Sequence, residues 1–427
     1  MKPRTAILIL TAAALASGMS AAQAPATPPP AAAPGGRGAP AVKSPEVSAD
    51  GKITFRLRAP NAKEVFVTGI GQRIAMQKNE QGVWTATTDT LKPDIYTYAF
   101  SADGITLNDP ANPLFKTSYG SAGSSLVHVP GAVSWEPAPG VARGAVTRHF
   151  YHSAVAGDDR DYWVYTPAGY DPKRKEAYPV LYLLHGLGDE AGSWIATGAA
   201  NVILDNLIAQ GKAKPMIMVN PLGYGNSGGP GGAMGADMLP AYARTVVEEV
   251  MPQVEKAYNV TRDRNQRAIA GLSMGGAEAT FVGLNHLDKF AWIGSFSGAY
   301  VMWPGARGAR GATAPPAAPA EAGRAGRGGP STIDAAAMPK NFPALDAKAN
   351  SQIRLLWIAC GTADGLVGVN RQFRDWLSTK DVKLTYIEVP DIAHVWPLWR
   401  QNLTDLAPLL FQAKARARIW FPATPRR

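Results

Sequence analysis

The pattern Gly-x-Ser-x-Gly occurs twice in the chain, at residues 225–229 and 271–275. The serine of this pattern can act as a nucleophile when it lies on a tight turn between a strand and a helix. Ser273 has that context, because it follows the apolar run RAIA and precedes the helical pattern GGAEATFVGLNHL. Ser227 lies in a Gly/Pro-rich stretch with neither element beside it, which is typical of a loop serine. Ser273 is therefore the predicted nucleophile.

A serine hydroxyl is a weak nucleophile and needs a base, which a third group usually orients. His394 follows the apolar run KLTYIEVP, and Asp364 follows the apolar run IRLLWIACG. The chain order serine, aspartate, histidine is that of the α/β-hydrolase triad. Asp391 and Asp375 are rivals for the acid, but the first is only three residues from the histidine and the second lies in a helical pattern. We therefore predict a triad of Ser273, Asp364 and His394.

Backbone N–H groups that stabilise an oxyanion are expected after another apolar strand. His185, Gly186 and Leu187 end the run VLYLLH, and the N–H of Leu187 could face a substrate carbonyl. Met274 follows the nucleophile and would supply the second donor, as in nucleophile elbows. Alternatively, this segment is only a turn that ends a strand.

The region from 147 to 412 alternates apolar strand runs with helical patterns, which predicts an α/β domain with a mostly parallel sheet. VLYLLH is apolar throughout, as expected of a strand that is buried on both faces. The stretch ADMLPAYARTVVEEVMPQVEKAY predicts a long helix that is interrupted near Pro252. Residues 303–350 form a Gly/Ala/Pro/Arg-rich insertion, for which we expect a flexible loop. Alternatives near the site are a lid or a basic clamp for acidic glycans.

A different pattern covers residues 44–130, where short runs such as GKITFRLR alternate apolar and polar residues between turn signals. This predicts a small all-β sandwich, and residues 131–146 would link it to the α/β domain. Trp84, Tyr96 and Tyr98 could stack on sugars. Aromatic residues of half-buried strands more often belong to the core, however.

The first residues have the pattern of a secretory signal peptide. An apolar stretch over 6–15 follows positive residues, and the small-x-small motif AQA ends at residue 24. The stretch is shorter than the roughly 20 residues that span a bilayer. We expect a signal peptide over 1–24, a Pro/Ala/Gly-rich linker over 25–43, no membrane span, and a secreted or periplasmic protein.

Composition excludes several other classes of protein. The net charge is +10, but the basic segments near 307–327 and 413–427 lack the aromatic residues and motifs of a nucleic-acid surface. The histidines are scattered, and the single cysteine, Cys360, lies in an apolar run. We therefore expect no disulfide, no metal, no cofactor and no nucleic-acid partner.

These motifs carry a family resemblance. The segments LLHGLGDEAGSW, ANVILDNLIAQGKAKPMIMVNPLGYG, RAIAGLSMGG, SFSGAY, LLWIACGTADGL and HVWPLWR resemble the esterase D-like family, in particular the feruloyl and acetylxylan esterases of carbohydrate esterase family 1. The resemblance implies an α/β-hydrolase fold with the same triad and the same two oxyanion donors. GKITFRLRAPNAKEVFV, GVWTATT, IYTYAF and DGITLNDPANP resemble an early-set immunoglobulin-like module of the carbohydrate-binding family 48 type. One departure is that Asp-Ile-Ala precedes His394 where the family has Gly-rich sequence.

The resulting expectation is a serine esterase that cleaves hydroxycinnamoyl esters of plant polysaccharides. Alternatives are an acetylxylan esterase, a siderophore esterase similar to enterochelin hydrolases, an acyltransferase to sugars, and a non-catalytic glycan-binding protein. The substrate would be a small-molecule or polysaccharide ester. Trp194, Trp396 and Trp399 could line its pocket or could serve only as packing.

Overall fold

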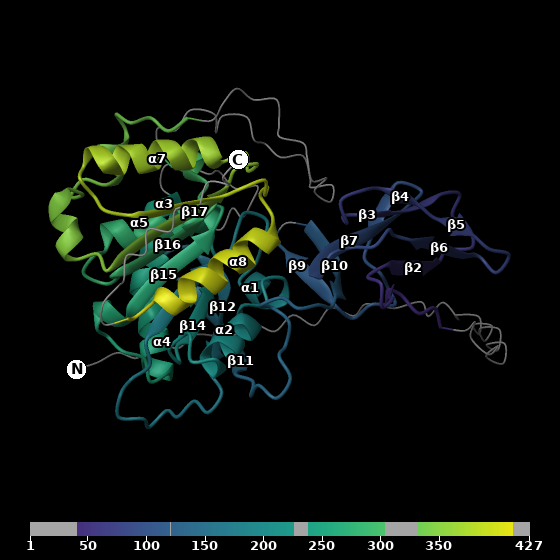
Figure 1. Ribbon diagram of the computed structural model, residues 1–427, viewed down its shortest axis with the longest axis horizontal. Coiled ribbons are helices and arrows are strands. Elements are labelled where there is room, and N and C mark those ends of the chain that lie inside the picture. The colour runs from purple at the N-terminus through teal and green to yellow at the C-terminus, as the bar shows by residue number, and fades with distance from the viewer. Residues whose placement is uncertain (1–40, 120, 226–237, 304–331, 413–427) are drawn as a thin grey trace, which may run out of the picture. The chain divides into compact units, whose positions relative to one another are not determined.

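In the computed structural model, an eight-stranded sheet with the order β11-β12-β14-β13-β15-β16-β17-β18 forms the centre of the α/β region (Figure 1). The structure describes residues 41–119, 121–225, 238–303 and 332–412. The strands are β11 (Ala145–Ser153), β12 (Asp158–Thr166), β13 (Val180–Leu184), β14 (Ile217–Pro221), β15 (Arg267–Leu272), β16 (Trp292–Phe296), β17 (Leu355–Gly361) and β18 (Thr385–Val389). The pairs from β14 to β18 are parallel, whereas β11 and β12 pair antiparallel at one edge. The predicted α/β-hydrolase class is confirmed.

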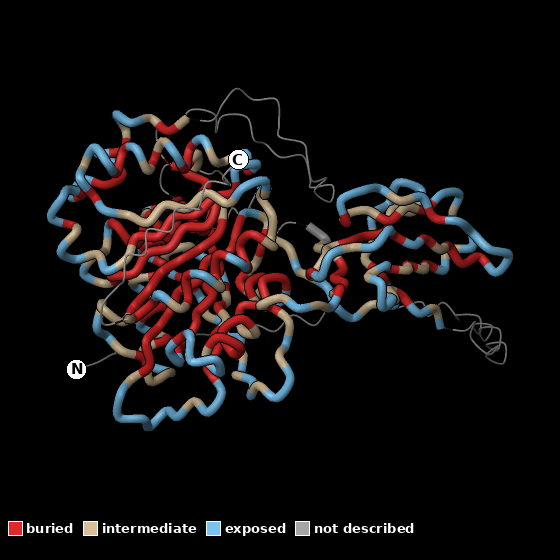
Figure 2. Tube along the Cα trace, viewed as in Figure 1, coloured by how far each residue is buried: buried red, intermediate tan, exposed pale blue. Residues whose placement is uncertain are grey.

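Helices cover both faces of this sheet (Figure 1). One face packs against α3 (Met238–Arg244), α4 (Met251–Ala257), α5 (Met274–Asn285) and α7 (Val367–Thr379), and the other against α1 (Ser193–Ala196), α2 (Ala200–Ala209) and α8 (Trp396–Leu406). Alternate residues of β13 enter the two cores, with Tyr182 in the first and Leu181 and Leu183 in the second. The parallel strands β13 to β17 are therefore buried on both sides (Figure 2), which explains their apolar runs, whereas the edge strand β18 is only partly buried.

The helical stretch before β15 is interrupted where the sequence predicts it. A π-helical turn (Thr245–Val250) separates α3 from α4, and Pro252 lies in the first turn of α4. Proline has no N–H to donate to the preceding turn, so one backbone hydrogen bond is missing there in any case. An irregular turn at this position therefore costs few additional hydrogen bonds.

Two antiparallel sheets form the N-terminal part of the described chain. The first has the order β1-β2-β6-β5, and the second has the order β4-β3-β7-β10-β9 with β8 beside β7. The strands are β1 (Glu46–Val47), β2 (Ile53–Arg58), β3 (Val65–Thr68), β4 (Ile74–Ala75), β5 (Gln77–Lys78), β6 (Val83–Thr87), β7 (Asp94–Ala102), β8 (Ile105–Leu107), β9 (Phe115–Ser118) and β10 (Ser121–Val129). Phe55, Tyr98 and Phe100 pack ring to ring in their shared core. This region is all-β, as the sequence predicts.

The aromatic residues of this sandwich serve mainly as core. Trp84 and Tyr98 are buried, and the indole N–H of Trp84 donates to the carbonyl of Ala59 at 2.9 Å. Of the three residues considered for sugar stacking, Tyr96 alone keeps part of its side chain exposed. Trp84 and Tyr98 therefore present no face on which a sugar could stack.

Two expectations about segments need correction. The hairpin of β11 and β12 begins at Ala145, where the sequence suggested a linker up to residue 146. β11 lies at the sheet edge with mostly polar, exposed side chains, so it carries no apolar signal. The segment 303–350 is not a loop at both of its ends, as was expected of an insertion. Trp303 is buried, and residues 338–349 place Met338, Phe342 and Ala349 in the core.

Arg400 of α8 joins the sandwich to the α/β region. Its fully buried guanidinium donates to the carbonyl of Thr197 at 2.8 Å and 3.0 Å, to the carbonyl of Ile95 at 3.3 Å, and to the carboxylate of Asp94. It also lies 5.2 Å from the ring centre of Trp135. The described residues from 42 to 412 form one compact unit.

Several expectations fall outside the described residues. They are the signal peptide over 1–24, the linker over 25–43 except its last residues, Ser227, and the basic tail over 413–427. Within the described part of the chain, no helix has the length and apolar character needed to cross a membrane.

Candidate active site

Ser273 lies on a strained turn between β15 and α5. Its φ of 53° and ψ of −115° are unusual for a residue with a side chain. Its N–H donates to the carbonyl of Phe296 at 2.8 Å, and its own carbonyl accepts from Ala299 at 2.8 Å and Ala277 at 3.1 Å. Neighbouring strand and helix thus hold the backbone in this conformation, which is characteristic of functional sites.

The flanking glycines are required by close approach. A Cβ on Gly271 would lie 2.3 Å from the carbonyl oxygen of Gly275, and a Cβ on Gly275 would lie 2.5 Å from that of His185. A side chain at either position would therefore force the turn away from β13. This packing is the physical reason for the Gly-x-Ser-x-Gly pattern here.

His394 and Asp364 form a hydrogen-bonded chain with Ser273. The two ring nitrogens of His394 lie 2.8 Å from Asp364 Oδ2 and 2.9 Å from Ser273 Oγ. Because a carboxylate can only accept, Nδ1–H donates to Asp364 and leaves Nε2 to accept the serine proton. His394 belongs to the loop after β18, and Asp364 to the loop after β17. The structure thus brings the three predicted residues together at the carboxyl ends of the strands.

The Asp364 side chain is fully buried, whereas the His394 side chain is 34% exposed. Burial raises the pKa of Asp364, but hydrogen bonding and charge attraction from His394, together with the N–H of Leu366 at 2.8 Å, outweigh it and hold this pKa below its ordinary value. The acid is therefore ionised where it can orient the imidazole, and the base can reach a substrate.

The other candidates for the acid, and the single cysteine, lie outside this hydrogen-bonded chain. Asp391 is exposed, and its own N–H bonds to Thr362. Asp375 is an exposed residue of α7 that pairs with Arg374. Cys360 is buried in β17, and burial raises the pKa of its thiol, which disfavours the reactive thiolate.

The two predicted oxyanion donors lie on adjoining segments. Met274 begins α5, and Leu187 follows β13. A Cβ built on Gly186 would lie 3.5 Å from the Cβ of Ser273, so the loop beside Leu187 reaches the nucleophile. Within the described part of the chain, neither N–H has a hydrogen-bond acceptor. Two N–H groups without acceptors beside a serine can bind a developing negative oxygen.

Sequence reasoning missed the residue that holds the loop carrying Leu187. The hydroxyl of Tyr224 accepts from the N–H of Gly188 at 2.9 Å and donates to the carbonyl of Asp189 at 3.0 Å. Tyr224 follows β14, so its place after another apolar strand was the available signal. No local pattern, however, indicates which carbonyl its hydroxyl reaches.

His185 also stabilises this region, as a neutral ring. Its Nε2 accepts from the N–H of Gly223 at 2.8 Å, which leaves Nδ1–H to donate to the carbonyl of Gly186 at 2.8 Å. Complete burial lowers the pKa of His185. The loop after β13 is thus tied to the loop after β14 by an uncharged group.

The three tryptophans proposed to line a pocket differ. Trp194 is fully buried, and its indole N–H donates to the carbonyl of Leu184 at 2.9 Å, so of the two alternatives it fits packing and not a pocket wall. Trp399 is also buried and packs edge-on against His394 with ring centres 4.8 Å apart. Trp396 is half-buried next to both. Only Trp396 offers appreciable surface to a substrate.

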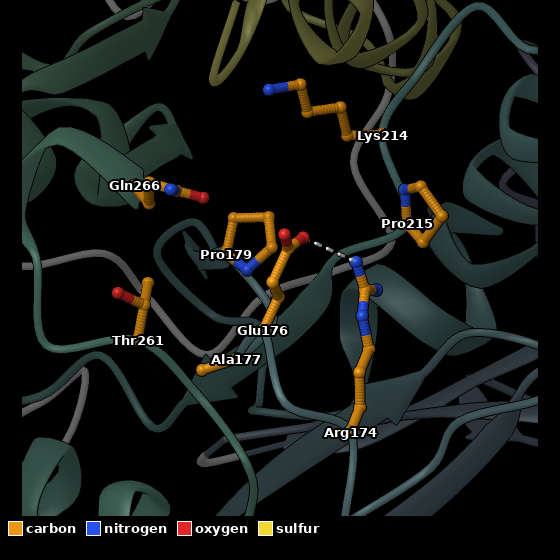
Figure 3. Close-up of a pocket in the computed structure, with 8 residues that line it drawn as sticks. All are labelled: Arg174, Glu176, Ala177, Pro179, Lys214, Pro215, Thr261 and Gln266. Atoms are coloured by element: carbon orange, nitrogen blue, oxygen red, sulfur yellow. Dashed lines mark hydrogen bonds and ion pairs between the residues drawn. The ribbon is translucent and has the colours of Figure 1, made fainter.

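A cavity of about 460 Å³ lies at the opposite edge of the sheet (Figure 3). Its walls come from segments just before β13, β14 and β15, and include Arg174, Lys214 and Gln266. Arg174 pairs with Glu176, and Lys214 donates to the carbonyl of Phe411 at 2.6 Å. Among the described residues, no cluster of His, Cys, Asp and Glu is arranged to hold a metal.

A model of the family described as "Putative esterase" matches residues 153–409. Among curated relatives, the endo-1,4-beta-xylanase/feruloyl esterase of Xylanibacter ruminicola is 28% identical over 383 residues, which cover 87% of this chain and 46% of that protein. Endo-1,4-beta-xylanase Y of Acetivibrio thermocellus is 30% identical over 148 residues, which cover 32% of this chain and 13% of that protein. The chain thus spans less than half the length of these relatives.

Solved structures share the fold. A ferulic acid esterase from Anaeromyces mucronatus has a TM-score of 0.51 at 23% identity, covering 66% of this chain and 96% of its own. The enterobactin esterase of Shigella flexneri, in the presence of 2,3-di-hydroxy-N-benzoyl-serine, has a TM-score of 0.54 at 19% identity, covering 83% and 92%. At these identities the similarity is one of fold.

Proposed function

Because a family model covers more than half of it, the chain belongs to the esterase family, and from this premise we propose that it hydrolyses carboxylic esters with Ser273 as nucleophile. The observation that carries the proposal is the continuous hydrogen-bonded chain from Ser273 through His394 to the buried Asp364. It supplies a nucleophile, its base and an orienting anion in one place.

In the proposed first step, Nε2 of His394 takes the proton of Ser273 while Oγ attacks the ester carbonyl carbon. The carbonyl oxygen becomes negative and is bound by the N–H groups of Leu187 and Met274. Collapse breaks the bond to the alcohol oxygen, which leaves with the proton held by His394. Water then attacks the acyl-enzyme, gives its proton to the same nitrogen, and releases the acid and free serine.

We propose a hydroxycinnamoyl ester of a plant polysaccharide as the substrate. The support is the relative named as an endo-1,4-beta-xylanase/feruloyl esterase, which matches this chain over 383 residues. The half-exposed Trp396 next to the buried Trp399 could contact an aromatic acyl group. Acetylated xylan and catecholate siderophore esters remain alternatives. Export through the signal peptide over 1–24 and glycan binding by the sandwich also remain predictions.

The experiment is hydrolysis by the purified protein of methyl ferulate, acetylated xylan and a ferric-enterobactin-type ester, side by side. Ser273→Ala should lower kcat by at least about 10⁴-fold with an unchanged circular dichroism spectrum, because the acyl-enzyme cannot form. A folded variant with full turnover would refute the assignment of the nucleophile.

The pattern of substrates then decides the acyl group. Preference for methyl ferulate supports the proposed substrate, and preference for acetylated xylan replaces it with a short acyl group. Turnover of the siderophore ester alone would overturn the polysaccharide reading while keeping the triad. A sugar acceptor added to each reaction identifies transfer, because it would yield acylated sugar in place of free acid.

A further inference from the structure

Strand β9 of the sandwich contacts the loop that carries the proposed oxyanion donor Leu187. The hydroxyl of Ser118 and the N–H of Tyr119, at 3.2 Å, both donate to the carbonyl of Gly188. Gly188 has a φ of 80°, a conformation that glycine tolerates. Two donors on one carbonyl fix the orientation of the peptide that follows Gly188.

A charge pair lies beside these hydrogen bonds. Lys116 of β9 pairs with Asp189, and the two side chains are only 17% and 7% exposed. Asp189 Oδ2 lies 3.5 Å from the position of a Cβ on Gly186, which is itself 3.5 Å from the Cβ of Ser273. The carboxylate is thus close to where the reaction would place a negative oxygen.

The sign of this charge matters for the reaction. A carboxylate poorly screened by water opposes the build-up of negative charge nearby, and an adjacent ammonium group cancels most of that field. Lys116 therefore has two effects, because it fixes the position of the Asp189 side chain and neutralises its charge. Without Lys116 the loop would keep an unpaired, nearly buried anion.

Tyr119 extends the same contact to the residue that holds the loop from the other side. Its ring packs on Tyr224 with centres 4.6 Å apart. The Tyr224 hydroxyl is bonded to both Gly188 and Asp189. Lateral movement of Tyr119 would therefore loosen both hydrogen bonds of that hydroxyl.

Strand β9, which makes these contacts, is held by strand pairing within the sandwich. β9 pairs with β10, and β10 pairs with β7. β7 begins at Asp94, which receives the buried Arg400 of α8. The sandwich is thus attached at two places, at the loop after β13 and at the helix that follows His394, and β9 can act as a fixed support.

We propose that strand β9 positions the loop of residues 186–189, and that Lys116 is a positioning residue for ester hydrolysis. The inference rests on the proposed function, since it assigns the support of the same oxyanion site. It makes the sandwich part of the hydrolytic machinery even toward esters that contain no sugar.

The test is Lys116→Met, assayed on 4-nitrophenyl acetate and methyl ferulate. We expect kcat to fall about 10- to 100-fold with KM changed less than about threefold, because misplacing an oxyanion donor affects the transition state more than the bound substrate. Binding of benzeneboronic acid, whose serine adduct mimics the tetrahedral intermediate, should weaken in parallel. A purely structural role would leave the folded fraction with normal kcat and normal boronate affinity.

Three further variants define the cause. Lys116→Arg keeps the charge and should retain kcat within about threefold. Lys116→Met combined with Asp189→Asn removes both charges and should recover at least about fivefold of the lost kcat. Arg56→Met breaks a comparable half-buried ion pair with Glu46 in the same sandwich and should leave kcat within about twofold.

Failure of the proposed function shows in the unmutated protein, which would then hydrolyse neither ester. The inference fails separately if that protein is active and folded Lys116→Met keeps its kcat, or if Arg56→Met loses as much. Should Lys116→Met not fold, Ser118→Ala replaces it, because it retains every charge and removes one donor to Gly188. It should lower kcat about threefold to tenfold, and an unchanged value would overturn the proposal.

Discussion

The two edges of the parallel sheet differ in how their polar groups are used. At the carboxyl edge, Ser273 has a strained backbone, and the N–H groups of Leu187 and Met274 have no acceptor among the described residues. At the amino edge there is a cavity of about 460 Å³, but its cations are occupied, Lys214 by a carbonyl and Arg174 by Glu176. Strain and unused donors lower stability and persist where they serve chemistry. The presence of a cavity therefore does not by itself identify the reactive edge.

Removing the charge at the carboxyl edge should have the largest effect. Asp364→Asn should lower kcat by about 10³- to 10⁴-fold, since the amide no longer forces the proton onto Nδ1 of His394 and Nε2 cannot act as base. Steady-state kinetics on methyl ferulate measure this. The matched control is Asp391→Asn in the neighbouring loop, where the exposed side chain should be replaceable within about twofold. Equal losses in both variants would contradict the assignment of the acid.

A second test of the carboxyl edge concerns stability. Glu278 of α5 is fully buried, neither carboxyl oxygen has a protein hydrogen-bond partner among the described residues, and burial raises its pKa well above the ordinary value. The folded state therefore keeps a proton that the unfolded state loses above its ordinary pKa. Stability should fall as pH rises through that window, by about 1.4 kcal/mol per pH unit.

Glu278→Gln removes this titration and should become more stable than the unmodified protein as pH increases from 5 to 8. Urea unfolding at several pH values measures the difference. Glu80→Gln, on the exposed surface of the sandwich, is the control and should show no such trend. A constant difference for Glu278→Gln across the range would show that this carboxyl ionises in the folded protein.

The smallest effect is expected at the amino edge. Arg174→Met breaks a surface ion pair with Glu176 and a cation–π contact with the ring of Tyr178. Exposed contacts of either kind contribute about 0–1 kcal/mol. We expect kcat within about twofold and a small change in Tm. A fall in kcat of tenfold or more in the folded variant would mean that the cavity in Figure 3 takes part in the reaction, and the contrast between the edges would fail.

The sequence predicts those site residues whose position is determined by the end of a strand. Ser273, Asp364 and His394 could each be found because each follows an apolar strand, and parallel strands bring such ends to one edge. The antiparallel hairpin of β11 and β12 was missed in part, since an edge strand with exposed polar side chains has no apolar period. The role of Trp194 stayed open between the two alternatives, because only tertiary packing distinguishes a pocket wall from a core residue.

Contacts between segments that are distant in the chain could not be predicted from the sequence. Lys116 and Asp189 are ordinary charged residues in their local patterns, and only the docked sandwich brings them together. Glu278 lies in the second turn of α5, after the nucleophile. In a helix on the protein surface, a glutamate at this position would be exposed and ordinary. Its complete burial depends on which side of α5 faces the sheet, and the weak apolar period of that helix does not settle this.

The bond between Arg400 and Asp94 also sets an order of events during synthesis. The two residues are 306 positions apart, and ribosomes add about 5–20 residues per second. The sandwich therefore leaves the ribosome roughly 15–60 s before the helix that anchors it exists. During that interval Asp94 has no guanidinium partner and the strands must persist on their own core. Nascent chains stopped before residue 400 should consequently carry a sandwich that is held only at the loop after β13, which makes α8 the element that completes the assembly.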